Sequence, residues 1–365
     1  MADYKLFSGD SHVSEPPDLW TKRIDRAFLY RAPFVETRER DGKRQDYMIY
    51  EGFPPHPVSI GLAAAAADAS GDKGQFQVRA TRYADALPGG WDPAARMKDQ
   101  DLDGVDGEVL HPTLGFRMFW LKDADLQRAV FASYNDWLGE YISHNRQRLV
   151  GLALISIYDI GAAVKEIERA AKLGHKGIMI ALSPGPGARP YSDPHYDPIW
   201  AEAQALGLPV VLHAITGGDE SRLSIAYWNP DMTIYPVIRH HEAERTLAHL
   251  LCSGVAERFP ALRFITAENG IDWIPPALAR MDKAMSFGTR ALQVNVWPTK
   301  LSLKPSEYFR RQFYVGFIDE PEAVPLRHEL GIDNLMWASD YPHFASTWPK
   351  SQAFVEKATA GVAPD

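Results

Sequence analysis

The feature of this sequence that most restricts its fold is the regular alternation of short apolar runs with helix-like segments from about residue 96 onward. The runs are nearly continuous in apolar side chains, which is typical of parallel strands buried on both faces. Residues 160–173 have the spacing of an amphipathic helix and are followed by Gly174, a common C-terminal stop. With one more run near the N-terminus we predict eight strands, at residues 6–12, 107–112, 150–157, 177–182, 209–213, 263–268, 313–317 and 335–340.

Helices are predicted between these strands, at residues 97–105, 123–145, 160–173, 198–205, 241–257 and 275–285. Eight parallel strands with intervening helices close most naturally into a barrel, and 365 residues accommodate a barrel with insertions. The pattern alone also permits a doubly wound open sheet. We predict a single α/β domain over residues 1–365, of the (β/α)8 TIM-barrel class.

A long insertion separates the first two predicted strands. Residues 30–95 fit no regular strand and helix period and contain a Pro54-Pro55 pair and an alanine run at residues 63–67. We expect this insertion to form a lid, a rim or an oligomer contact. A helical alanine segment at residues 61–69 without a functional role is the alternative.

Composition argues against several kinds of partner. The net charge of −8 and the lack of a long basic run disfavour a nucleic-acid surface. The sequence contains no stretch of about 18 apolar residues and no signal-peptide pattern, so no membrane span is expected. Cys252 is the only cysteine, which rules out a thiolate zinc site and favours a reducing cytoplasm. We expect a cytoplasmic protein with a small-molecule substrate.

Polar side chains close several of the predicted strands, and in a barrel the chemistry lies at those C-terminal strand ends. Asp10 and His12 are two residues apart on the first strand and should therefore share one face, although a simple polar strand end is the alternative. The residues of this kind are Asp10, His12, His111, His213, Glu268, Asp340 and His343. Carboxylates and imidazoles without thiolates suit Zn, Mn or Fe, so the sequence predicts a metal site.

Four motifs carry a resemblance to a known family. They are DSHVSEPPDLW from residue 10, His213, AENGIDWIP from residue 267 and SDYPH from residue 339. Together they resemble the amidohydrolase-related branch of the metal-dependent hydrolase superfamily, which includes aminocarboxymuconate semialdehyde and hydroxybenzoate decarboxylases. The resemblance covers about residues 5 to 350 and is weak only across the insertion. It also implies a homodimer.

The resemblance implies that His12, His213 and Asp340 ligate a divalent metal. Asp10 stands in place of the first residue of the family's H-x-H or E-x-H pair. Glu268 replaces a histidine that many members carry, which removes a usual proton-transfer group. The fourth predicted strand has no lysine at its interior end, so a carbamylated-lysine bridge between two zinc ions is not expected.

With one ion, two reactions are compatible with these residues. A metal-activated water or a metal-polarised carboxylate would support hydrolysis or nonoxidative decarboxylation of a small or medium organic acid, ester, lactone or thioester. Asp340 or Glu268 would act as general base, and His343 or His111 would stabilise developing negative charge. The sequence does not choose between the two reactions.

Surplus ligands raise a second possibility, a non-haem diiron centre that activates O2. Glu15, Glu268 and the additional histidines exceed what one ion needs. Oxygenases on the same barrel are similar at the N-terminal motif and are associated with bulky substrates, CoA-linked ones included. Hydrogen-bond support of the ligands also explains the surplus, and we favour one ion. A non-catalytic barrel is the third class, in which the ligand set would have no role.

Two further residues are candidates for substrate binding. Arg117 follows the strand that ends at His111 and is suited to bind a substrate carboxylate, with a surface salt bridge as the alternative. Trp273 is suited to line an apolar pocket, although most of the tryptophans are expected to serve packing.

Overall fold

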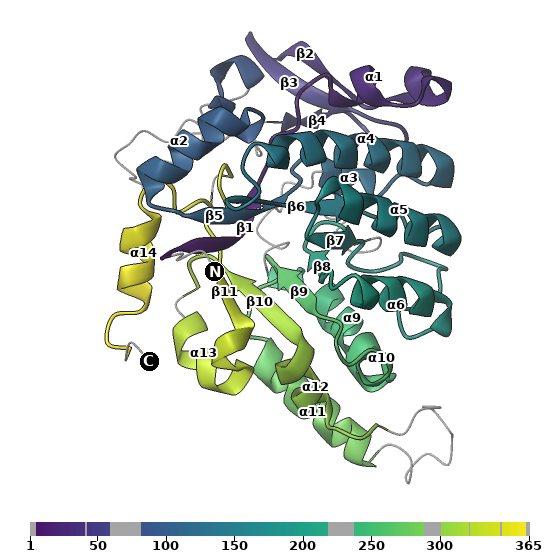
Figure 1. Ribbon diagram of the computed structural model, residues 1–365, viewed down its shortest axis with the longest axis vertical. Helices are drawn as coiled ribbons and strands as arrows, with labels where there is room; N and C mark the ends of the chain where they lie inside the picture. The colour runs from purple at the N-terminus through teal and green to yellow at the C-terminus, as the bar shows by residue number, and fades with distance from the viewer. Residues whose placement is uncertain are drawn as a thin grey trace. The chain divides into compact units, whose positions relative to one another are not determined.

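The structure is a computed structural model, shown in Figure 1. It describes residues 5–40, 42–58, 82–217, 237–287, 301–320, 322–343 and 345–362. The alanine segment expected at residues 61–69 lies outside these residues. The chain forms two compact units. Unit 1 comprises Met1–Leu154, Lys172–Lys176 and Trp337–Asp365, and unit 2 comprises Ile155–Ala171 and Gly177–Met336.

Eight strands lie where the apolar runs predict them, to within a few residues. They are β1 (Phe7–His12), β5 (Gly107–His111), β6 (Leu149–Leu154), β7 (Gly177–Ile180), β8 (Val210–His213), β9 (Phe264–Ala267), β10 (Phe313–Phe317) and β11 (Leu335–Trp337). Strand neighbours run β1-β5-β6 in unit 1 and β7-β8-β9-β10 in unit 2, all in parallel pairs. A doubly wound sheet would reverse this order part-way. The predicted (β/α)8 TIM-barrel class is confirmed.

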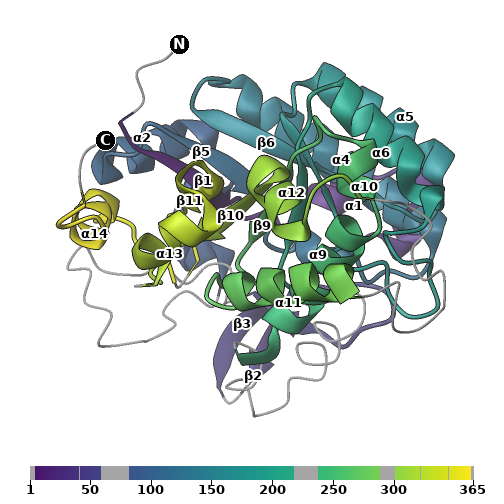
Figure 2. The same cartoon turned by 90° about the horizontal axis from the view of Figure 1, so that it is seen from below.

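Helices alternate with these strands. They are α1 (Leu19–Arg23), α2 (Pro93–Asp103), α3 (Gly115–Met118), α4 (Ala124–Ser143), α5 (Ile160–Leu173), α6 (Asp197–Ala205), α9 (His240–Cys252), α10 (Val255–Arg258), α11 (Ile274–Phe287), α12 (Pro305–Gln312), α13 (Ala323–Leu330) and α14 (Ser351–Ala358). The helix predicted at residues 241–257 is divided in two, because Gly254 adopts a left-handed φ of 89°. In unit 2, α11 lies beside α9 and α12 (Figure 2). In the described part of the chain, no helix has the length and apolar character needed to cross a membrane.

Gly174 ends helix α5 as predicted and adopts a φ of 101°. A Cβ at this position would overlap the guanidinium of Arg146, which donates to Leu173 O at 3.1 Å. We expect Gly174→Ala to lower the free energy of unfolding by about 1–2 kcal/mol, because a side chain disfavours left-handed backbone. Gly161→Ala, at the start of the same helix, should be neutral or stabilising. Urea unfolding of both variants measures the difference, and equal stabilities would contradict this assignment.

The insertion forms a small antiparallel sheet, of β2 (Phe34–Arg40), β3 (Lys43–Ile49) and β4 (His56–Pro57). This explains why residues 30–95 show no strand and helix period. Tyr47 and Met48 of β3 are buried, and Val35 N donates to Pro17 O at 3.3 Å, which ties the sheet to the segment after β1. A role as lid, rim or oligomer contact stays a prediction.

The two ends of the chain meet within unit 1. The segment after β11 lies along β1, with Asp340 N donating to Asp10 O at 3.0 Å and His12 N donating to Tyr341 O at 2.5 Å. On its other side β1 pairs with β5, with His12 opposite His111. Residues from three separate parts of the sequence are thereby brought side by side.

Candidate active site

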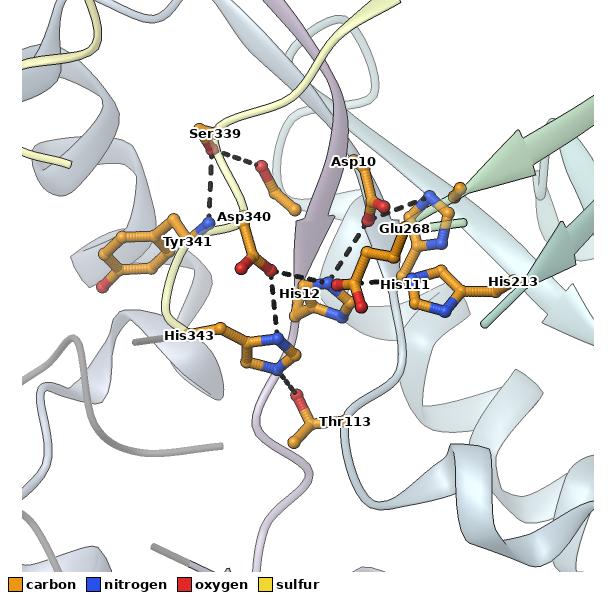
Figure 3. Close-up of polar contacts among 12 residues, drawn as sticks. Asp10, His12, His111, Thr113, His213, Glu268, Ser339, Asp340, Tyr341 and His343 are labelled. Carbon is orange, nitrogen blue, oxygen red and sulfur yellow. Dashed lines mark hydrogen bonds and ion pairs between the residues drawn. The ribbon is translucent and has the colours of Figure 1, made fainter. Parts of the chain in front are cut away.

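The centre of the site in unit 1 is the imidazole of His12, at the end of β1. Its Nε2 lies 3.3 Å from Asp10 Oδ1 and 3.1 Å from Asp340 Oδ1 (Figure 3). All three side chains are buried. The prediction that Asp10 and His12 share one face of the strand is confirmed, and Asp340 joins them from the segment after β11.

The hydrogen bond of the second ring nitrogen of His12, Nδ1, shows that this nitrogen carries a proton. Nδ1 lies 2.8 Å from Pro112 O, and because a carbonyl oxygen only accepts, Nδ1 is the donor. In the neutral ring, Nε2 then presents its lone pair to the carboxylates of Asp10 and Asp340. This arrangement is favourable when a proton or a metal ion lies between Nε2 and the carboxylate oxygens. A metal-binding histidine usually donates its other ring N–H to a carbonyl or a carboxylate, as Nδ1 does here.

His343 extends this cluster. Its Nδ1 lies 3.0 Å from Asp340 Oδ1, its Nε2 lies 2.9 Å from Thr113 Oγ1, and its ring stacks on that of His12 with 3.7 Å between centroids. The potential ligand atoms of His12, Asp340 and His343 lie within 4.8 Å of one another. Thr113 and Pro112 are not among the residues predicted from sequence. Their place directly after His111, at a strand end, is the signal that points to them.

His111, at the end of β5, faces the same cluster. Its Nε2 lies 3.4 Å from Asp10 Oδ1, and its ring centroid lies 5.7 Å from that of His12. Asp10 thus contacts two buried imidazoles (Figure 3). His111 is therefore placed to hold Asp10 in position or to act on a group bound beside it.

Glu15 lies in a different environment. Its Oε1 accepts from Thr113 N at 3.1 Å and Gly115 N at 2.8 Å, and its Oε2 accepts from Leu114 N at 2.9 Å. Burial raises the pKa of Glu15, and these backbone donors oppose that shift. Among the described residues, the groups whose ligand atoms cluster within 4.8 Å do not include Glu15.

Two of the predicted ligands belong to unit 2. His213, at the end of β8, has Nε2 3.6 Å from Glu268 Oε1, just after β9. Nδ1 of His213 lies 2.8 Å from Ala214 O, so this ring too directs its Nε2 lone pair at a carboxylate. His12 and His213 therefore share the same arrangement, with a carbonyl at one nitrogen and a carboxylate at the other.

Two of the carboxylate residues have unusual backbone conformations. Asp340 has a φ of 55° and Glu268 a φ of 57°, both in the left-handed region that few residues other than glycine adopt. Such conformations cost of the order of 1–3 kcal/mol and cluster at functional sites. In each case the chain turns sharply where a strand ends, which directs the carboxylate back toward a neighbouring imidazole.

Arg117, a predicted substrate-binding residue, lies in α3 and is only 8% exposed. Its guanidinium lies 5.5 Å from the ring centroid of Trp120. From the insertion, Tyr50 hydrogen-bonds to it. The pKa of nearby His56 is lowered well below its usual value by burial and by the charge of Arg117. Arg117 is thus a buried cation beside aromatic groups.

Trp273, the other predicted substrate-binding residue, is 7% exposed. Its indole nitrogen donates to Asn269 O at 2.9 Å and to Gly270 O at 3.0 Å, and its ring stacks on His240. These contacts stabilise the turn that follows Glu268, so most of the Trp273 side chain is buried by packing.

The donor set fits a divalent ion. Ligand atoms about 2.0–2.2 Å from zinc lie about 3.0–3.6 Å from each other at the usual angles. The separations around His12 are 3.1 and 3.3 Å, and that between His213 and Glu268 is 3.6 Å. Oxygen and imidazole donors without thiolate suit Zn, Mn or Fe.

A (β/α)8 barrel with carboxylates and imidazoles at its strand ends is the architecture of many metal-dependent enzymes. A family model described as amidohydrolase matches residues 38–363. The chain therefore belongs to the amidohydrolase family, and the resemblance seen in the four motifs is confirmed. Since the match begins after β1, Asp10 and His12 lie outside the matched residues.

Several curated and solved relatives are named decarboxylases. The chain is 25% identical to 2-amino-3-carboxymuconate-6-semialdehyde decarboxylase of Dictyostelium discoideum, over 69% of this chain and 67% of that protein. It is 29% identical to the 5-carboxyvanillate decarboxylase of Sphingomonas paucimobilis, over 72% of this chain and 76% of the other, with a TM-score of 0.58. The corresponding enzyme from Novosphingobium aromaticivorans, solved with bound manganese, shares the fold with a TM-score of 0.67, 20% identity and coverage of 100% and 92%.

Proposed function

We propose that this chain is a metal-dependent, nonoxidative decarboxylase of a small carboxylic acid, with hydroxylated aromatic acids as the first substrates to test. The observation that carries the proposal is the position of His12, with Nε2 facing Asp10 and Asp340 and Nδ1 held by Pro112 O. The reactions named for its relatives, on 2-amino-3-carboxymuconate-6-semialdehyde and on 5-carboxyvanillate, support decarboxylation over hydrolysis.

The ligands predicted from sequence and from the family resemblance stay the proposed set, and they are Asp10, His12, His213, Glu268 and Asp340. We propose one ion, manganese or zinc, because the donors are oxygen and imidazole and a relative was solved with manganese. When bound, such an ion would polarise the substrate's carboxylate or a neighbouring oxygen. A homodimer and a cytoplasmic location stay predictions.

The residues of unit 1 supply what decarboxylation requires. The bond between the carboxyl carbon and the ring breaks, CO2 leaves, and the ring carbon gains one proton. We assign this proton to Asp340, whose Oδ1 lies 3.0 Å from His343 Nδ1, so that His343 can return a proton after each turnover. Arg117 is assigned to a second anionic group of the substrate, because a buried guanidinium pairs well with a carboxylate.

The test measures CO2 release, methanol release and O2 consumption by the same protein. The metal-free protein is loaded with manganese or with zinc and given 5-carboxyvanillate, 2,6-dihydroxybenzoate or a methyl ester of each acid. We expect CO2 release from at least one acid, at least tenfold faster than from the metal-free protein. Methanol release from the esters without CO2 would instead identify a hydrolase. In the protein as purified, before metal is removed, two irons per chain with O2 consumption would identify the diiron oxygenase, and either result would overturn the proposal.

A further inference from the structure

The turn that follows β5 is tied to the segment after β1 by Glu15. This side chain is fully buried, and its carboxylate accepts from the backbone N–H groups of Thr113, Leu114 and Gly115. A Cβ at Gly115 would come within 3.0 Å of Glu15 Oε1 and 2.8 Å of Pro112 Cβ. The carboxylate therefore fits closely into a set of converging N–H donors, an arrangement that binds anions well.

The same turn presents two groups to the cluster around His12. Pro112 O accepts from His12 Nδ1 at 2.8 Å, and Thr113 Oγ1 lies 2.9 Å from His343 Nε2. Thr113 N is itself one of the donors to Glu15, so Glu15 binds the residue that contacts His343, and the neighbouring residue, Pro112, contacts His12. A displacement of this turn would move the acceptor that fixes the His12 proton and the hydroxyl that holds His343.

A carboxylate at this place also has a specific electrostatic effect. Three N–H dipoles point at Glu15, and a neutral side chain would leave at least one of them without a good acceptor, which costs about 1–3 kcal/mol. The turn would then relax toward other acceptors. In its present shape the turn directs three N–H groups at Glu15 and Pro112 O at His12.

We propose that Glu15 is a positioning residue: through the turn at residues 112–115 it fixes the His12 proton on Nδ1 and the orientation of the His343 ring, and it does not ligate the ion. The inference rests on the proposed metal site and narrows the ligand set predicted from sequence. It predicts that Glu15 acts on the imidazoles even when no metal is bound.

The experiment uses the full-length protein with the change Glu15→Gln, which keeps the size of the side chain and removes its charge. In the metal-free protein, long-range 1H–15N correlation spectra report which nitrogen of His12 carries the proton, with the signal assigned through His12→Gln. We expect one slowly exchanging Nδ1–H signal of His12 in the wild type, because this proton is held by Pro112 O, and a broadened or lost signal in Glu15→Gln. Zinc affinity, measured by chelator competition, should fall about 10–100-fold.

Two controls separate this role from a general loss of structure. Glu51→Gln makes the same change at an exposed glutamate of the insertion and should leave both measurements at wild-type values. Thr113→Val removes only the hydroxyl and should alter the His343 signal while leaving His12 as the Nδ1–H form. If Glu15→Gln does not fold, Glu15→Asp and Thr113→Val carry the test, with Glu15→Asp intermediate in zinc affinity.

Two results would overturn the inference. One is an unchanged His12 signal together with unchanged zinc affinity in Glu15→Gln. The other is complete loss of zinc while His12 keeps its Nδ1–H form, since that is the behaviour of a direct ligand. Neither measurement uses turnover, so a failure of the decarboxylase assay is distinguishable from a failure of this inference.

Discussion

Replacement of Asp340 by alanine is expected to reduce the metal content of the purified protein at least tenfold and to abolish CO2 release. Asp340 Oδ1 lies 3.1 Å from His12 Nε2 and 3.0 Å from His343 Nδ1, so its loss removes a proposed ligand and the proposed proton carrier together. The melting temperature of the metal-free protein should fall much less than the metal content does. Without a metal ion, two buried carboxylates lie beside His12 and their like charges disfavour each other, so removing one of them costs little. Elemental mass spectrometry of protein prepared without added metal measures the first effect.

Two further variants make this result specific. Asp333→Ala changes an exposed aspartate seven positions earlier and should leave the metal content unchanged. Asp340→Asn keeps a side chain that tolerates the left-handed φ of 55°, and therefore separates the lost charge from the backbone strain. A wild-type metal content in both Asp340 variants would remove Asp340 from the proposed ligands.

The second large effect is expected for Arg96→Met, in unit 1 behind the site. Arg96 is fully buried, with Nε donating to Glu108 Oε2 and Nη1 to His12 O, at 2.6 and 2.7 Å. Its guanidinium also lies 4.3 Å from the ring centroid of Tyr341. Methionine fills a similar volume but leaves the Glu108 carboxylate buried without its cation. Such a loss costs about 3–5 kcal/mol, which should appear as a marked shift of the urea midpoint.

The control for Arg96 is Lys22→Met, which removes the cation of an exposed pair with Asp18 on α1. Exposed pairs contribute little, so its midpoint should stay close to that of the wild type. The double change Arg96→Met with Glu108→Leu should recover part of the lost stability, because the Glu108 carboxylate is then no longer buried without its cation. Equal midpoints for Arg96→Met and Lys22→Met would contradict the role given to the buried pair.

Much of the barrel could be predicted from sequence because its strands are short apolar runs with clear ends. The bounds of β10 at Phe313–Phe317 and of α5 at Ile160–Leu173 agree with the prediction residue for residue. The sheet at Phe34–Ile49 could not be found in this way, since β2 reads FVETRER and presents few apolar residues to mark a buried face. Its stability comes from pairing with a neighbouring strand, which a single run of sequence does not reveal.

The candidate site was predictable in residue type but not in geometry. Polar residues that close apolar runs drew attention to Asp10, His12 and Asp340, which the structure brings together in unit 1. The sequence could not indicate that Pro112 O accepts the Nδ1 proton of His12, because every residue has a backbone carbonyl and the residue type does not show which one will be the acceptor. Nor could the sequence show that the carboxylate of Glu15, which could have been a metal ligand, accepts hydrogen bonds from three backbone N–H groups.

The pairing of β1 with the segment after β11 has a consequence for how the protein matures during synthesis. Asp10 and His12 leave the ribosome before Asp340, which is held beside them by backbone hydrogen bonds to β1 and follows about 330 residues later. At about 5–20 residues per second, this delay is on the order of tens of seconds. During that time the nascent chain holds only part of the proposed ligand set, so on the proposed function tight metal binding requires that Asp340 has been synthesised, and a chain released before Asp340 would carry the N-terminal motif with an incomplete cluster.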